Sequence, residues 1–164
     1  MQAANNKKAK ASIAITVNGA SLDLLTLLGK NAKATAPTVG FKKLIPYGSS
    51  ANFAYKNGKA RIDARGSYQY GLIEGGWIWG PCDYNLAGVA YGMSKGEAEA
   101  AITKNGYHYS RSTVYKGITT ITYSKAYLNN CIEVDVDYKG DKVVGVIALF
   151  CGEFPWDDDG YLGI

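Results

Sequence analysis

Hydrophobic and polar residues alternate most regularly near the end of the chain. Between positions 132 and 138 every second residue is hydrophobic and the residues between them are acidic: Ile132, Val134, Val136 and Tyr138 alternate with Glu133, Asp135 and Asp137. This period of two predicts a strand with one face in the core and the other toward solvent or a partner. The turn residues Lys139-Gly140-Asp141 follow, and the apolar residues 143–151 predict the returning strand of a hairpin.

A short helix is predicted over residues 94–104. Ser94 is a suitable N-cap, and Glu97, three residues later, completes a capping-box pattern. Asn105-Gly106 supplies a left-handed stop. The apolar face of this helix is small, and the residues after it are strand-like as far as position 151. The helix is therefore expected to pack on an antiparallel sheet.

The first half of the chain contains two Asn-Gly pairs, which are strong hairpin signals. Asn18-Gly19 follows a strand-like segment, and Asn57-Gly58 separates residues 52–56 from residues 59–65. The buried side of the second hairpin is expected to contain Phe53, Tyr55, Ala60 and Ile62. The leucines at 24–28 predict either a short helix or a buried turn, residues 31–37 a loop, and residues 39–46 another strand.

These elements predict an α+β fold. It would be mainly antiparallel β-sheet, with one short helix at about 94–104 packed on it and a second, weaker helix near 23–30. Residues 12–151 are expected to form one domain, either undivided or built from two halves, 12–88 and 89–151. The Lys-rich residues 1–11 are expected to be a disordered linker, and residues 152–164 an acidic aromatic tail.

Composition and charge exclude several classes of protein. No apolar run approaches the roughly 18 residues that a membrane span needs, and this chain shows no signal-peptide pattern. The net charge of +4 is modest, and the Lys and Arg residues are scattered without an RNA-binding aromatic motif. We therefore expect neither a membrane span nor a nucleic-acid partner.

The residues that could carry chemistry do not form a recognised motif. His108 is the only histidine, and the three cysteines lack the Cys-x-x-Cys spacing of a zinc site. We therefore predict no metal site, no cofactor and no identifiable catalytic residue. Cys131 and Cys151 flank the last hairpin, which indicates either a cross-strand disulfide or two neighbouring buried thiols. Cys82 would then be the unpaired cysteine; the alternative is a pairing that involves Cys82.

The segment from 68 to 91 is the best candidate for a binding surface, because aromatic residues are crowded among glycines there. The residues expected to contact a partner are Tyr70, Trp77, Trp79 and Tyr84. The alternative is that the two tryptophans fill the core between the two halves. On a regular strand Trp77 and Trp79 would share one face, so both would serve the surface or both would serve the core.

Two short stretches carry a resemblance to known proteins. Residues 89–97, Val-Ala-Tyr-Gly-Met-Ser-Lys-Gly-Glu, followed by a short helix and a Tyr-rich strand, resemble the opening of β-lactamase-inhibitor-protein-like modules and of small envelope-assembly lipoproteins. Residues 15–19 and the leucines after them resemble the start of secreted proteins of unknown function from Gram-positive gut bacteria. The resemblance implies an extracytoplasmic, non-enzymatic binding or assembly module with an α+β sheet.

Together these observations favour a non-catalytic extracytoplasmic binding module, secreted or at the cell surface. Its partner would be a protein, a peptide or a glycan, held by an aromatic-rich sheet or loop surface. One alternative is a structural or assembly protein of the envelope or surface, which would form multimers. Another is a hydrolytic enzyme with unidentified carboxylates, which would have a deep pocket holding acids of raised pKa.

Overall fold

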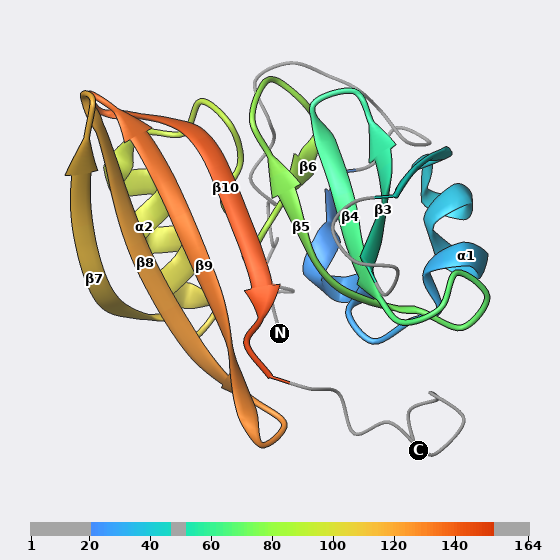
Figure 1. Ribbon diagram of the computed structural model, residues 1–164. Coiled ribbons are helices and arrows are strands. Elements are labelled where there is room, and N and C mark those ends of the chain that lie inside the picture. Colours follow the sequence, from blue (N-terminus) through green and yellow to red (C-terminus); the bar gives the residue numbers. More distant parts are fainter. Residues whose placement is uncertain (1–20, 47–51, 153–164) are drawn as a thin grey trace, which may run out of the picture.

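The computed structural model describes residues 21–46 and 52–152, and an eight-stranded antiparallel sheet dominates them (Figure 1). The order across the sheet is β2-β3-β4-β5-β10-β9-β8-β7. The strands are β2 (Lys43–Pro46), β3 (Asn52–Asn57), β4 (Ala60–Arg65), β5 (Leu72–Ile78), β7 (His108–Tyr115), β8 (Ile118–Tyr127), β9 (Asn130–Lys139) and β10 (Lys142–Phe150). The predicted α+β class with a mainly antiparallel sheet is confirmed.

Short helices accompany the sheet. The first group is η1 (Leu24–Leu27), α1 (Ala32–Thr35) and η2 (Ala36–Val39), and α2 (Lys95–Lys104) stands alone. Figure 1 shows α2 behind β8 and β9. Two short strands, β1 (Leu22–Asp23) and β6 (Tyr84–Asn85), form a separate two-stranded parallel sheet. In the described part of the chain, no helix has the length and apolar character needed to cross a bilayer.

The chain builds the same arrangement twice. A helical segment is followed by the four-stranded meander β2–β5, and a second helix, α2, is followed by the meander β7–β10. The last strands of the two meanders, β5 and β10, pair antiparallel in the middle of the sheet. Because the strand order reads the same from either edge, an approximate two-fold axis passes between these two strands. The two meanders therefore form one continuous sheet, and each contributes to both of its faces.

One face of the sheet forms the core with the helices. In β9 the alternation read from the sequence is confirmed, because its hydrophobic residues are buried and its acidic residues are half-buried: Ile132, Val134, Val136 and Tyr138 against Glu133, Asp135 and Asp137. The hairpin at Asn57-Gly58 is confirmed with its expected buried side. From α2, Ala98 and Ile102 are buried against this core.

The start of α2 has the predicted capping box. The Ser94 hydroxyl accepts a hydrogen bond from the Glu97 N–H at 3.2 Å, and the Glu97 carboxylate accepts one from the Ser94 N–H at 2.8 Å. Two otherwise unpaired backbone donors are therefore satisfied. These hydrogen bonds lower the pKa of the exposed Glu97 carboxyl from its usual value.

Two expectations from the first half need correction. Residues 31–37, read as a loop, contain α1 and the start of η2, since the Asn31 side chain caps α1 by accepting from Ala34 N–H. The strand expected over 39–46 is only the four residues of β2. The Gly-rich segment after position 66, to which the sequence assigned no definite element, contains the central strand β5. The hairpin at Asn18-Gly19, the linker and the tail lie outside the described residues.

Candidate functional site

The second face of the sheet, which we call the open face, is opposite the helices and the core. It is defined by a row of cross-strand neighbours that runs through all eight strands. From one edge to the other the row is Lys43, Lys56, Arg61, Trp77, Ile147, Asp135, Thr122 and Arg111. The described helices pack on the other face; within the row Thr122 is buried, at 3% exposed, and the other members keep exposed surface.

Three cations stand side by side at one end of the row. Lys43 lies opposite Lys56, and Lys56 lies opposite Arg61. Like charges directly opposite each other on a sheet are destabilising, so the Lys43–Lys56 pair costs stability in the isolated protein, whereas Arg61 is already paired with Asp63. An acidic group of a partner would relieve that repulsion. This end of the open face therefore suits an anionic surface.

Two ion pairs hold the arginines of β4 in place. Arg61 Nε lies 2.8 Å from Asp63 Oδ1, and Arg65 Nε lies 2.7 Å from Glu74 Oε2. Both carboxylates are buried, while both arginines keep exposed surface. Burial raises the pKa of Glu74 above its usual value, although the Arg65 charge acts in the opposite direction. The acids fix the arginine side chains in one orientation on the open face.

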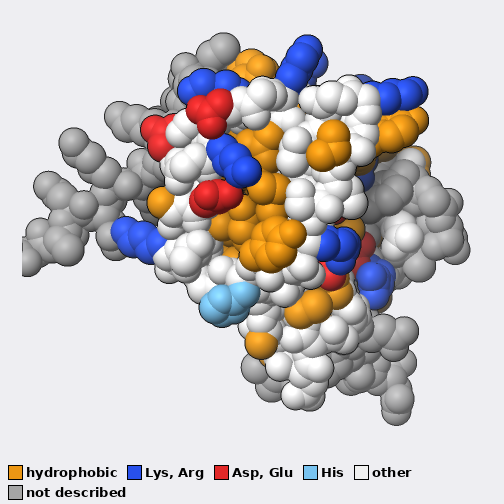
Figure 2. Space-filling view, turned by 90° about the vertical axis from the view of Figure 1, so that its left-hand side faces the viewer, with side chains coloured by type: hydrophobic (Ala, Val, Ile, Leu, Met, Phe, Trp, Pro, Cys, Tyr) orange, Lys and Arg blue, Asp and Glu red, His pale blue; other side chains and the backbone are white. Residues whose placement is uncertain are grey.

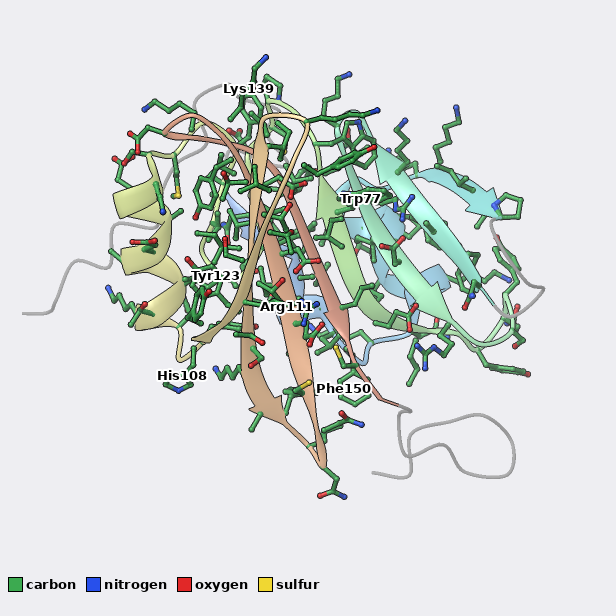
Figure 3. The ribbon with its side chains drawn as sticks, turned by 60° about the vertical axis from the view of Figure 1, so that its left-hand side comes forward. Trp77, His108, Arg111, Tyr123, Lys139 and Phe150 are labelled. Atoms are coloured by element: carbon green, nitrogen blue, oxygen red, sulfur yellow. The ribbon has the colours of Figure 1, made fainter. Side chains whose placement is uncertain are left out.

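Trp77 lies at the centre of this arrangement. The Arg61 guanidinium carbon is 4.0 Å from the centroid of the Trp77 ring, and the Trp79 ring is 5.6 Å away, edge-on. Lys56 Nζ lies 5.1 Å from the Trp79 ring. Both tryptophans are half-buried, so each keeps surface for contact. Figure 3 shows Trp77 and, further along the sheet, Arg111.

The other end of the open face combines acids with threonines. Thr122 donates a hydrogen bond to Asp135 at 2.5 Å, and Thr120 donates one to Asp137 at 2.5 Å. Arg111 reaches across β8 to Glu133, at 3.5 Å. The acidic side chains of β9 are therefore already bonded to side chains of neighbouring strands. This end of the open face is polar and lies beside the cationic and aromatic end.

The four residues expected to contact a partner divide into three groups. Trp77 and Trp79 lie on the open face, as the shared-face argument allows. Tyr70 is exposed in the turn before β5. Tyr84 is corrected: it is 1% exposed and packs against Phe41, with ring centroids 4.6 Å apart, which leaves it no surface for a partner. Its hydroxyl also donates to the Val39 carbonyl, at 3.3 Å.

Several residues of the open face were not among those expected from the sequence. Asp63 reaches the neighbourhood of Trp77 through the pairing of β4 with β5, and Ile147 through the pairing of β5 with β10. The Asn57-Gly58 turn was a usable signal, because its register places Lys56 opposite Arg61. No local pattern specifies the pairing of β5 with β10.

The cysteines lie partly as expected. Cys131 and Cys151 are neighbours at the end of the β9–β10 hairpin, where the Cys151 N–H donates to the Cys131 carbonyl at 2.8 Å. Both are free thiols in the structure, as is the buried Cys82. Burial and the hydrogen bond with Cys131 raise the pKa of Cys151 to about 11. The disulfide between Cys131 and Cys151 stays a prediction.

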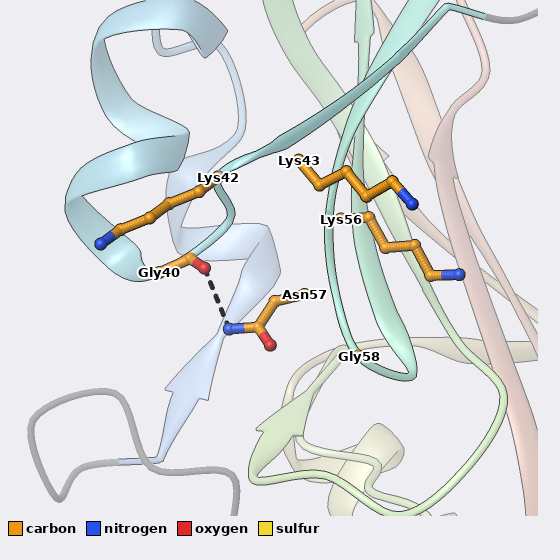
Figure 4. Close-up of a pocket in the computed structure, with 6 residues that line it drawn as sticks. All are labelled: Gly40, Lys42, Lys43, Lys56, Asn57 and Gly58. Atoms are coloured by element: carbon orange, nitrogen blue, oxygen red, sulfur yellow. Dashed lines mark hydrogen bonds between the residues drawn. The ribbon is translucent and has the colours of Figure 1, made fainter.

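Metal and pocket chemistry were also considered. Within residues 21–46 and 52–152, no group of three or more His, Cys, Asp or Glu side chains is placed to hold a metal ion. A shallow hollow near the β3–β4 turn is lined by Gly40, Lys42, Lys43, Lys56, Asn57 and Gly58. Figure 4 shows Lys42 pointing away from Lys43 and Lys56. The three amines do not converge on one anion, and the lining contains no carboxylate for acid–base chemistry.

Comparison with known proteins adds no further assignment. No protein family, no curated protein and no solved structure matches this chain. The resemblance to β-lactamase-inhibitor-protein-like modules therefore stays a prediction. The function is argued from the open face and its residues.

Proposed function

We propose that this protein is a non-catalytic binding module that acts outside the cytoplasm and holds a protein partner on the open face. The observation that carries the proposal is the position of Trp77 between Arg61 and Trp79 in the middle of that face. Tryptophan and arginine are the residues that most often supply interface energy, and such residues cluster near the centre of an interface.

The open face is also pre-organised for binding. Arg61 is held both by Asp63 and by the Trp77 ring, so little side-chain freedom remains to be lost on association. Ordering a rotamer-rich side chain at an interface costs roughly 0.5–1.5 kcal/mol. Because Arg61 is already ordered, binding through this face avoids part of that entropy cost. This supports the interpretation of the open face as a binding surface.

The charge on the open face indicates which kind of partner surface fits. Lys43 and Lys56 lie opposite each other, beside the Arg61–Asp63 ion pair, and would be neutralised by carboxylates around an apolar contact on Trp77. A protein or peptide surface with an acidic rim meets both needs. An acidic glycan is a weaker fit, since it would leave Ile147 in the same row without an apolar partner.

The proposed location rests on two supports. One is the resemblance of residues 89–97 to extracytoplasmic binding modules. The other is the placement of Cys131 and Cys151 opposite each other, as a disulfide in an oxidising compartment requires. We therefore propose a secreted or surface-exposed protein.

Affinity capture with matched variants tests this function. The full chain, Trp77→Ala and Tyr68→Ala are immobilised and exposed to the secreted and surface proteins of the producing cells. Tyr68 is an exposed aromatic residue in the turn before β5, so Tyr68→Ala controls for the loss of any surface ring. We expect one protein to be retained by the full chain and by Tyr68→Ala, and lost with Trp77→Ala.

Two results would contradict the proposal. Equal retention by all three proteins would place binding elsewhere. Stable multimers of the chain alone, with nothing retained, would support the structural alternative instead.

A further inference from the structure

The two edges of the sheet differ sharply. The β2 edge is four residues long and carries Lys43 and Pro46, which are typical protections against strand addition. The β7 edge is eight residues long, and every residue in it is exposed. It contains neither proline nor acid, and no strand among the described residues pairs with its outer side. A β-bulge interrupts the pairing of β7 with β8 between Tyr109 and Arg111, and the residues from Arg111 to Tyr115 form a regular edge with free backbone groups.

Exposed hydrophobic side chains accompany this edge. Tyr109 is 65% exposed, Val114 73% and Tyr115 71%, which are the three highest values among the large hydrophobic residues of the described chain. Figure 2 shows the side of the molecule on which β7 lies, where a hydrophobic area stands beside the single histidine with charged groups around it. Tyr109 and Val114 pair with Tyr123 and Thr119 and belong to the helix-side face, which α2 leaves uncovered here.

We propose that the outer edge of β7 adds an extended strand from a partner protein, in which apolar and acidic residues alternate. The chain's own β9 shows the complementarity. There, acidic residues on the open face accept hydrogen bonds from the threonines of β8, while the residues between them are buried on the helix side. β7 continues the same rows, with Thr113 opposite Thr120 and Arg111 opposite Thr122.

An added strand of this kind satisfies both faces of β7. Its apolar residues cover Tyr109 and Val114 on the helix side, and its acidic residues lie near Arg111 on the open face. Arg111 is 55% exposed despite its contact with Glu133, so its charge remains accessible. The backbone hydrogen bonds supply affinity, and the alternation supplies specificity, as in other cases of strand addition.

A second copy of this chain fits the edge less well. Its β7 carries no acid, and antiparallel pairing about Ser112 would place the two Arg111 side chains on one face as diagonal neighbours. Charge complementarity therefore favours an acidic partner strand over self-association. The inference goes beyond the open-face function, because it rests on the β7 edge; Arg111 is the one residue that it shares with the open-face row.

A synthetic peptide tests the proposal on the full chain. The probe has the sequence of residues 130–139 with Cys131→Ser, and the reference peptide replaces its three acids with lysine. Amide hydrogen exchange of the labelled protein is followed by NMR as each peptide is added. We expect the acidic peptide to protect alternate amides of β7 and the lysine peptide to protect none.

Variants at the two edges sharpen the result. Arg111→Glu should weaken binding of the acidic peptide by about tenfold or more and allow the lysine peptide to bind. Arg111→Gln, which removes the charge without reversing it, should give an intermediate loss. Lys42→Glu reverses an exposed charge directly before β2, at the opposite edge and outside the open-face row, and should leave peptide binding unchanged.

Three outcomes would overturn the proposal. The first is an absence of β7 protection with the acidic peptide up to about 1 mM. The second is equal protection by both peptides, which would remove the role of Arg111. The third is protection of the β7 amides in the absence of peptide, together with the mass of a dimer. That result would mean that a second copy of the chain binds the β7 edge.

Discussion

Arg61 on β4 and Trp77 on β5 are direct cross-strand neighbours, and the guanidinium carbon of Arg61 lies 4.0 Å from the Trp77 ring centroid. Asp63 holds the same arginine at 2.8 Å. The three residues form one unit in the middle of the open face, with its orientation fixed before any partner arrives. The predictions below concern this unit and the elements that support it.

The cations around the tryptophans should affect fluorescence quenching. The chain has three tryptophans, so Trp156→Phe leaves only Trp77 and Trp79. Arg61 and Lys56 lie next to these rings and attract anions. In Trp156→Phe, iodide should therefore quench the emission more effectively than caesium does at equal concentration.

The control for this measurement is Lys56→Glu in the same background, which should reduce the advantage of iodide over caesium. An emission spectrum that neither ion quenches would mean that both rings are buried. That result would remove the two tryptophans from the proposed contact surface.

The capping box of α2 should have a measurable effect on stability. Ser94→Ala removes the acceptor of the Glu97 N–H and should lower the free energy of unfolding by about 1 kcal/mol. Urea denaturation followed by circular dichroism measures this change. Ser112→Ala, at an exposed position on β7, should stay within about 0.5 kcal/mol of the unsubstituted protein. Equal stability of all three proteins would contradict the role assigned to the cap.

Cys131 and Cys151 should form a disulfide when oxidised. They lie opposite each other on adjacent strands, where Cα atoms are about 5.5 Å apart, within the range that a disulfide spans. A thiol assay on the denatured protein should count three free thiols before oxidation and one after it. With Cys151→Ser no intramolecular bond should form.

The rate of this oxidation should increase with pH. The pKa of Cys151 is raised to about 11, so its thiolate is scarce near neutral pH and becomes more abundant as the pH rises. A bond between Cys82 and either of the other cysteines would contradict the pairing of β9 with β10.

The buried Glu74 should make stability depend on pH. Its pKa is raised above the usual 4.5 in the folded protein, so the folded state binds more protons than the unfolded state between the two values. Stability should therefore fall as the pH rises from about 4.5 through the folded pKa, and then level off. Glu74→Gln lacks this titration, and denaturation at several pH values should show its stability rising relative to the unsubstituted protein over that window. A constant difference would contradict the raised pKa.

The sequence predicted those elements whose signals are local. The alternation in β9, the turn at Asn57-Gly58 and the cap at Ser94 each depend on residues within a few positions of one another. Each was confirmed because tertiary packing agrees with the local preference.

Strand β5 was missed for a physical reason. Gly75 and Gly76 resemble loop residues, yet a Cβ at Gly75 would overlap the carbonyl oxygen of Ala148 on β10. Glycine is needed there because the two meanders approach closely, and that approach depends on residues more than seventy positions apart. The centre of the open face could therefore not be assembled from the sequence.

The predicted site residues also depended on whether the signal was local. Trp77 and Trp79 share a face, as a period of two requires. Tyr84 was misplaced because the segment after β5 turns beneath the sheet, where its ring packs on Phe41 in the core. An aromatic residue among glycines carries no local sign of which side of the sheet it will occupy.

Site-specific photo-crosslinking tests the central claim most directly. A benzophenone amino acid replaces Trp77 in one protein and Tyr68, off the open face, in another, and each is irradiated in the producing cells. The open-face account predicts a discrete adduct with one partner protein from position 77 and none from position 68. Adducts of equal yield from both positions, or an adduct from position 68 alone, would contradict it.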